Sequence, residues 1–201
     1  MSIADPAIAY PRSMDEPTAS LVRAARKAFS QYGPDRATMT DVARAAGVVR
    51  QTLYYTVSSR DQLLELAIVQ CCEELQEQID SWQLETELDL DEALVEFLAR
   101  AIELAGSSQE LSALSAALPT ERVEAVLGKS HPVGALIHSS LSPILERARS
   151  DGRLRTGVSI DEASRWLQGV LTFALLHDDP TPETLRNELR KFALPSVFNE
   201  R

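Results

Sequence analysis

The 201-residue sequence is poor in the features that mark secreted, membrane-spanning and disulfide-linked proteins. Its two cysteines, Cys71 and Cys72, are adjacent on a predicted helix, where neighbouring side chains point apart and a disulfide is disfavoured. No basic segment followed by an apolar one opens the chain, and the longest apolar run, Gly169–Leu176, is far shorter than the roughly 20 residues that span a bilayer. We therefore expect a protein of the reducing cytoplasm with no membrane partner.

Motifs for catalysis and cofactor binding are also missing. The patterns Gly-x-Ser-x-Gly, Ser-x-x-Lys and His-Glu-x-x-His do not occur. Gly128-Lys129-Ser130 looks like the end of a phosphate-binding loop, but Val123 stands where that loop requires glycine. His131 and His138 are seven residues apart, a spacing that suits packing or a pocket wall better than metal ligation. The sequence thus predicts no enzyme, no metal site and no cofactor.

Charge is distributed unevenly along the chain. The net charge is -10, yet residues 1–60 carry 8 basic and 5 acidic side chains, which makes that segment positive. The remaining residues carry 12 basic and 25 acidic side chains. A basic head on an acidic body is expected when only the head meets a polyanion, while the acidic surface keeps the body soluble.

Apolar residues recur with a helical period, and no stretch alternates as a strand does. The pattern predicts an all-α protein of about nine helices. They fall at residues 17–32, 38–46, 50–57, 60–82, 91–106, 109–128 (broken at Pro119), 132–151, 160–177 and 181–198. Residues 1–16, with two prolines and no period, are expected to form a disordered arm. The outer face of the first helix carries Arg23, Arg26 and Lys27, either as a solvated face or as contacts to a nucleic-acid backbone.

Residues 38–64 predict two short helices joined by a turn. Thr38 stands at an N-cap position, and Gly47 can take the positive φ that stops the first helix. The second helix begins near Arg50 and turns Leu53 and Val57 inward. Its outward side is polar and aromatic, as in a recognition helix, so the segment is a candidate helix-turn-helix.

Three runs in this motif have a fixed spacing: Thr38-x-x-Asp41-Val42-Ala43-x-x-Ala46-Gly47-Val48, Thr52-Leu53-Tyr54-Tyr55 and Ser58-Ser59-Arg60-Asp61-x-Leu63-Leu64. With these runs the chain resembles the DNA-binding domain of the tetracycline-repressor (TetR) family over roughly residues 20–64. Val49 departs from the pattern, because the family commonly has a capping serine there and valine cannot cap. Arg60 replaces the usual lysine and keeps its charge.

The resemblance implies a helix-turn-helix domain at residues 17–58 and a helical body at 59–201 that binds an effector and dimerises. It implies a ligand-responsive transcriptional regulator, by default a repressor. Such a protein binds a near-palindromic double-stranded DNA operator as a homodimer and is released by a small apolar or aromatic effector. The alternative is a helical protein–protein adaptor in which the helix-turn-helix is only structural. A small all-α enzyme would need an acid–base or metal constellation that the sequence lacks.

The positions that match the family's DNA contacts can be given roles by their chemistry. Arg50 suits guanine and Gln51 suits adenine, and Thr52 can touch a thymine methyl. Hydroxyl and basic groups nearby suit phosphates. The full set is Thr38, Thr40, Arg50, Gln51, Thr52, Tyr54, Tyr55, Thr56 and Arg60.

Two further sites follow from the resemblance. The family's effector cavity maps to a mostly apolar set with few hydrogen-bonding groups: Cys71, Trp82, Phe97, Ile102, Leu114, Leu118 and His138. Each of these residues taken singly also suits an ordinary core. The last two predicted helices are expected to form a four-helix interface between two chains, with Trp166, Val170, Phe173 and Leu189 in contact.

Overall fold

The computed structural model describes residues 14–81, 89–177 and 181–199, and these form helices. In order they are α1 (Glu16–Tyr32), α2 (Met39–Ala46), α3 (Arg50–Thr56), α4 (Arg60–Asp80), α5 (Leu90–Ser107), α6 (Gln109–Ala116), α7 (Thr120–Lys129), α8 (His131–Ser150), α9 (Ile160–His177), α10 (Pro182–Glu188), the π-helical turn η1 (Leu189–Ala193) and α11 (Leu194–Val197). Since α10, η1 and α11 follow one another directly, they form one rod. The predicted all-α fold is confirmed, and the predicted break at Pro119 separates α6 from α7.

Two predicted features fall largely outside the described residues. The expected arm at residues 1–16 is described only from Met14, and its last residue already belongs to α1. That helix starts early because the Asp15 side chain accepts a hydrogen bond from the Thr18 amide (3.0 Å) and Pro17 favours a first turn. Trp82, a predicted effector contact, also lies outside the described residues.

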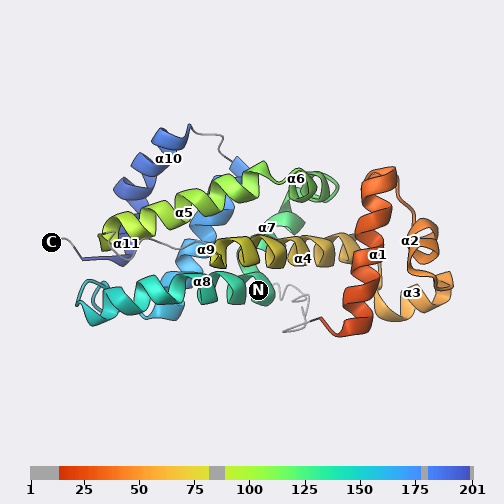
Figure 1. Ribbon diagram of the computed structural model, residues 1–201, viewed down its shortest axis with the longest axis horizontal. Helices are drawn as coiled ribbons and strands as arrows, with labels where there is room; N and C mark the ends of the chain where they lie inside the picture. The colour runs from red at the N-terminus through yellow and green to blue at the C-terminus, as the bar shows by residue number, and fades with distance from the viewer. Residues whose placement is uncertain (1–13, 82–88, 178–180, 200–201) are drawn as a thin grey trace, which may run out of the picture.

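Helix α4 forms the axis of the molecule (Figure 1). The three-helix head, α1–α3, lies at the end where α4 begins, with α1 crossing that end. Of the body, α5–α8 pack on the rest of α4, while α9 packs on α5, α7 and α8, and the C-terminal rod packs on α5. Ser59 caps the start of α4 by accepting a hydrogen bond from the Gln62 amide (3.1 Å).

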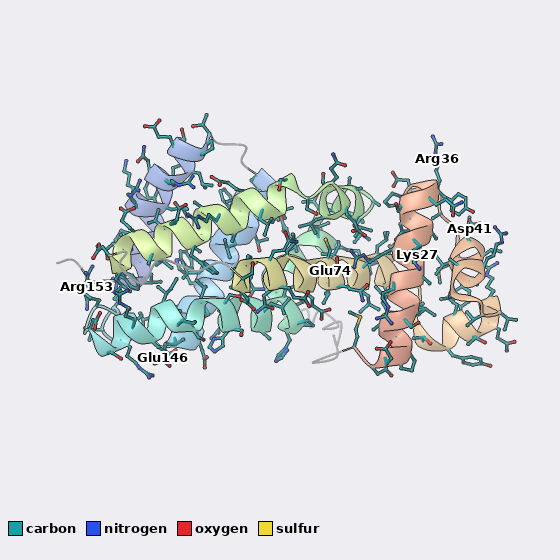
Figure 2. All side chains as sticks on the ribbon, viewed as in Figure 1. Lys27, Arg36, Asp41, Glu74, Glu146 and Arg153 are labelled. Carbon is teal, nitrogen blue, oxygen red and sulfur yellow. The ribbon has the colours of Figure 1, made fainter. Side chains whose placement is uncertain are left out.

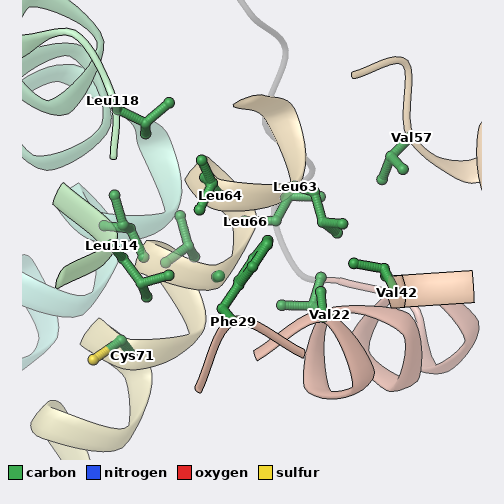
Figure 3. Packing of buried hydrophobic residues seen from close by; sticks show 14 of the residues in the cluster. Val22, Phe29, Val42, Val57, Leu63, Leu64, Leu66, Cys71, Leu114 and Leu118 are labelled. Carbon is green, nitrogen blue, oxygen red and sulfur yellow. The ribbon is translucent and has the colours of Figure 1, made fainter. Parts of the chain in front are cut away.

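The apolar core of the head continues into the body. Phe29 of α1 and Val42 of α2 are buried in the same cluster as Leu63 and Leu64 of α4 and Leu114 of α6 (Figure 3). The cluster thus does not stop at the boundary predicted between residues 58 and 59. Burial of these side chains fixes α1 on the first half of α4 and on α6.

A second core cluster fills the other end of the body. It joins α5, α8, α9 and the C-terminal rod through side chains such as Leu98, Leu145 and Leu167. Leu189 belongs to this cluster and is only 4% exposed. Leu189 therefore packs within its own chain beside α5, and its predicted place in an interface between chains stays a prediction.

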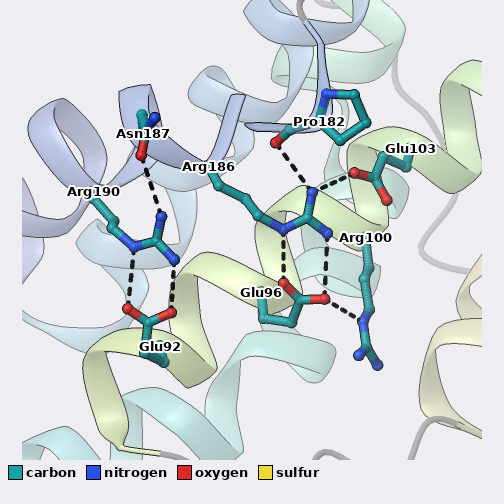
Figure 4. A network of polar contacts seen from close by, with 8 residues as sticks. All are labelled: Glu92, Glu96, Arg100, Glu103, Pro182, Arg186, Asn187 and Arg190. Carbon is teal, nitrogen blue, oxygen red and sulfur yellow. Dashed lines mark hydrogen bonds and ion pairs between the residues drawn. The ribbon is translucent and has the colours of Figure 1, made fainter. Parts of the chain in front are cut away.

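Arginines of the C-terminal rod bind glutamates of α5 on the outside of the second cluster (Figure 4). Arg186 Nε donates to Glu96 (2.9 Å) and its Nη1 donates to Glu103 (2.6 Å), while Arg190 binds both oxygens of Glu92. Hydrogen bonds from Arg186 hold the pKa of Glu96 below its usual value, and Arg190 does the same for Glu92. The rod is thus fastened to α5 by ionised carboxylates.

These shifts predict a loss of stability in acid. A carboxylate with a lowered folded-state pKa stabilises the fold above its unfolded pKa, and that contribution disappears as the pH falls through the folded value. Thermal unfolding should show the wild-type melting temperature falling below about pH 4.5, near the ordinary glutamate pKa. Arg186→Gln should show a shallower fall, while Arg149→Gln, which removes an exposed partner of Glu146, should follow the wild type. Equal slopes for the wild type and Arg186→Gln would contradict this role.

None of the helices in the described residues has the length and apolarity required to cross a bilayer.

Candidate DNA interface and effector cavity

The first helix of the motif, α2, is fixed by caps at both ends. Thr38 Oγ1 accepts a hydrogen bond from the Asp41 amide (3.2 Å), and the Asp41 carboxylate accepts one from the Thr38 amide (3.0 Å). Hydrogen bonds from Thr38 lower the pKa of Asp41. Gly47 ends the helix at a φ of 67°, where a side chain would be strained. The predicted roles of Thr38 as a cap and Gly47 as a stop are confirmed.

The second helix of the motif, α3, begins at Arg50 as predicted. Val49 occupies its N-cap without a side-chain hydrogen bond, so the helix relies on packing instead of capping. Leu53 and Val57 provide that packing, because both are buried in the core shared with α1 and α4. The remaining side chains of α3 point outward and are exposed: Arg50, Gln51, Thr52, Tyr54, Tyr55 and Thr56. Such an exposed polar face can enter a major groove.

Side chains one turn apart on α3 form hydrogen bonds with each other. The Arg50 guanidinium lies over the Tyr54 ring, 5.5 Å from its centroid, and donates to the Tyr54 hydroxyl (3.2 Å). Gln51 Nε2 donates to the hydroxyl of Tyr55 (3.1 Å), whose side chain is among the most exposed apolar ones. These contacts extend Arg50 and Gln51 along the helix surface with their hydrogen-bonding groups accessible to a base edge.

Thr38 and Thr40 are exposed on α2, whereas Arg60 is partly enclosed. Arg60 Nε donates to the carbonyl of Ala37 (3.3 Å), and an Nη donates to the carbonyl of Pro34. Arg60 therefore joins the start of α4 to the turn between α1 and α2. A guanidinium has five donors, so this bracing leaves some free for a phosphate.

Two basic side chains of the head were not singled out from the sequence. Arg36, before α2, is exposed at the edge of the head (Figure 2), and Arg44 is exposed on α2. The positive charge of residues 1–60 was the available signal, but it does not say which arginines face outward. Both suit backbone phosphates beside α3.

A cavity of about 110 Å³ lies in the body between α4, α5, α8 and α9, and Leu111 of α6 and Leu127 of α7 complete its wall. Helix α4 contributes side chains one turn apart, and the lining is mostly apolar. Its polar groups are the amide of Gln76, the hydroxyls of Ser140 and Thr172, and the Cys72 thiol, whose pKa burial raises to about 12. Gln76 Nε2 donates to Ser140 Oγ (3.2 Å) and to the Leu136 carbonyl (3.3 Å), which places a small polar cluster in an apolar wall.

The cavity includes only part of the predicted effector set. Phe97 and Ile102 line it. Cys71 turns away from it, with Sγ 3.9 Å from Ser108 Oγ, and its neighbour Cys72 takes its place. Leu114 and Leu118 are buried in the first core cluster, and His138 faces Asp161 (3.5 Å) near the surface. These four expectations do not fit the cavity, because helix rotation and the tilt of α6 were not readable from sequence spacing.

An apolar surface runs along α9 and the C-terminal rod. Trp166 and Phe173 are 57% and 58% exposed and share a face of α9 with the partly exposed Val170. Phe192, 64% exposed, lies on η1. Trp166 Nε1 donates to Ser196 Oγ of the rod (2.8 Å), so the rod is in contact with this face of α9 at Trp166. Large side chains so exposed on one surface indicate an interaction site.

A helix-turn-helix with an exposed recognition face, placed at the end of a long helix that runs into a helical body, defines a DNA-binding transcriptional regulator. The sequence profile described as bacterial regulatory proteins, tetR family, matches residues 21–67. This match covers 47 of the 201 residues and identifies a tetR-family DNA-binding domain in the head, which confirms the resemblance found in the sequence. No curated protein sequence matches the chain.

Solved structures share its fold over nearly the whole length. The transcriptional repressor QsdR of R. erythropolis is 21% identical with a TM-score of 0.66, covering 94% of this chain and 100% of its own. The TetR family repressor AlkX from Dietzia sp. strain DQ12-45-1b is 21% identical with a TM-score of 0.63, covering 93% and 97%. The fatty acid degradation regulator FadR from Bacillus halodurans is 18% identical with a TM-score of 0.54, covering 90% and 96%. These likenesses show the fold.

Proposed function

We propose that the chain is a ligand-responsive repressor that binds a near-palindromic operator as a homodimer in the cytoplasm and releases it when a small apolar effector enters the body. One observation carries this proposal: α4 begins beside the helix-turn-helix and also supplies Cys72, Leu75, Gln76 and Ile79 to the cavity. A compound in the cavity therefore touches the helix on which the head is mounted.

DNA selection tests the first part of the proposal. Purified chain should enrich a near-palindromic sequence from a random double-stranded pool, with half-sites about one helical turn apart. The competing view, a helical adaptor, receives support only from the apolar surface on α9. It predicts no enriched sequence at physiological salt, and that result would overturn the operator-binding role.

The cavity defines the class of effector. An engineered apolar cavity of about 150 Å³ binds benzene, so about 110 Å³ suits one small ring or a short alkyl chain. The Gln76–Ser140 pair can bind one polar end. FadR is a regulator of fatty acid degradation and AlkX is implicated in the biodegradation of n-alkanes, which supports testing alkyl compounds as well. Benzyl alcohol and 1-hexanol are direct probes.

Filling the cavity should abolish this response. Ala101 lines the cavity from α5, and a leucine there would occupy its free volume. We expect Ala101→Leu to lose the rise in melting temperature that benzyl alcohol or 1-hexanol gives the wild type, since a ligand stabilises only the fold that binds it. Ala113→Leu adds the same volume to the exposed face of α6 and should keep the response. An unchanged response in Ala101→Leu would place the effector elsewhere.

A further inference from the structure

Arg26 of α1 does not lie on a solvated face. Its side chain is only 12% exposed. Nε and Nη2 donate to the two oxygens of Glu110 (both 2.7 Å), and Nη2 and Nη1 donate to the two oxygens of Glu74. Nη1 also donates to the Gln70 side chain (3.2 Å). All five N–H donors of the guanidinium are therefore used.

The three partners come from α4, on which α1 packs, and from α6. Gln70 and Glu74 lie one turn apart on α4, and Glu110 lies in the first turn of α6. Figure 2 shows Glu74 on the stretch of α4 that approaches α1. Hydrogen bonds from Arg26 hold the pKa of Glu110 below its usual value, so the carboxylate stays ionised.

The same two helices line the effector cavity. Leu111, the residue after Glu110, is a wall of the cavity. On α4, Cys72, Leu75 and Gln76 face the cavity between and beyond the residues that hold Arg26. Because helices move as rigid units, a shift of either wall changes the relative positions of the two carboxylates that share one guanidinium.

We propose that Arg26 is the positioning residue that fixes the head on α4 and α6, and that through it a movement of the cavity wall reorients the recognition helix. This proposal rests on the proposed function, because it names the regulation of that cavity. Arg26 adds a side-chain connection to the covalent one that α4 already provides. It differs from Arg23, which lies on the same helix but pairs only with Glu16 of α1 at the surface.

Substitutions at Arg26 distinguish the role of the guanidinium's hydrogen-bonding geometry from the role of its positive charge. Arg26→Lys keeps the charge but has three donors on a single nitrogen, so it cannot bind both carboxylates in two-point fashion. Arg26→Gln also removes the charge and leaves Glu74 and Glu110 facing each other. Arg23→Gln is the matched control, since it removes an arginine one turn away without touching α4 or α6.

The first test measures coupling. Operator affinity of each variant is determined without and with saturating benzyl alcohol or 1-hexanol, and compound affinity is measured by calorimetry. Effective release requires the compound to lower the operator affinity of the wild type by about a hundredfold. In Arg26→Lys and Arg26→Gln the compound should lower operator affinity by less than about tenfold. Both variants should bind the compound itself with wild-type affinity. Arg23→Gln should behave as the wild type. Wild-type coupling in both Arg26 variants would overturn the proposal.

The second test needs neither DNA nor effector, so it separates this proposal from the proposed function. Spin labels are placed at Arg44→Cys on the head and Arg149→Cys on α8, with Cys71 and Cys72 replaced by alanine, and the labelled chain is prepared in excess unlabelled chain. We expect a broader head-to-body distance distribution for Arg26→Gln and an unchanged one for Arg23→Gln. If no compound releases the wild-type operator, the ligand-response proposal fails and the transmission through Arg26 with it. An unchanged distribution in Arg26→Gln would show that Arg26 does not fix the head.

Discussion

Phe173→Glu should convert the protein to a monomer and lower its operator affinity by about a hundredfold or more. In an isologous interface each substitution occurs twice, so two carboxylates would be placed in an apolar contact about the symmetry axis. Burying an unpaired charge costs far more than the contact contributes. A single head would then lose the effective concentration that its tethered partner provides at the second half-site.

Light scattering at micromolar concentration and an operator shift assay measure the two effects. Trp166→Glu should act like Phe173→Glu, because both side chains are exposed on one face of α9. Ala116→Glu, which adds the same charge to an exposed position on α6, should leave both mass and affinity unchanged. A Phe173→Glu chain that stays dimeric would exclude this surface, and a monomer with full operator affinity would exclude the need for a dimer.

The C-terminal rod shows where the sequence pattern was sufficient and where it was not. Helical periodicity predicted a continuous helix over residues 181–198, and a continuous rod is present. The π-turn at Leu189–Ala193 adds a residue per turn, which rotates the side chains after it. A regular 3.6-residue period would place Phe192 on the same face as Leu185 and Leu189. Within the π-turn Phe192 instead faces outward, while the two leucines are buried.

The candidate sites differ in how well the sequence predicted their residues, for a physical reason. The exposed face of α3 depends on local spacing, because Leu53 and Val57 fix which side is buried. The cavity depends on how six helices cross, so a shift of one residue replaces Cys71 by Cys72 in its wall. Arg26 illustrates the same limit. Its place on the outer face of α1 does not predict a contact with Glu110 of α6, which is 84 residues away in the sequence.

Arg50→Ala should relax base preference at one operator position and reduce affinity for the selected sequence by about 1–3 kcal/mol, roughly 5- to 150-fold. The guanidinium is extended over the Tyr54 ring and can bind guanine in two-point fashion. Removing it leaves the base edge without partners, so other bases at that position should bind nearly as well. Gln51→Ala should have the same kind of effect at a neighbouring position.

Arg60→Ala provides the contrast, because we propose that Arg60 meets a phosphate, which carries no sequence information. Its affinity should fall for every sequence alike, and the slope of log affinity against log salt should become shallower by about one ion. Arg60 also braces the turn before α2 through Ala37, so the melting temperature should fall as well and must be measured alongside.

Tyr54→Phe keeps the ring beneath Arg50 and loses only the hydroxyl, and its base preference should stay intact. Selected-pool binding curves for these variants decide the matter: an Arg50→Ala chain with wild-type preference at every position would show that α3 is not the element that reads the operator.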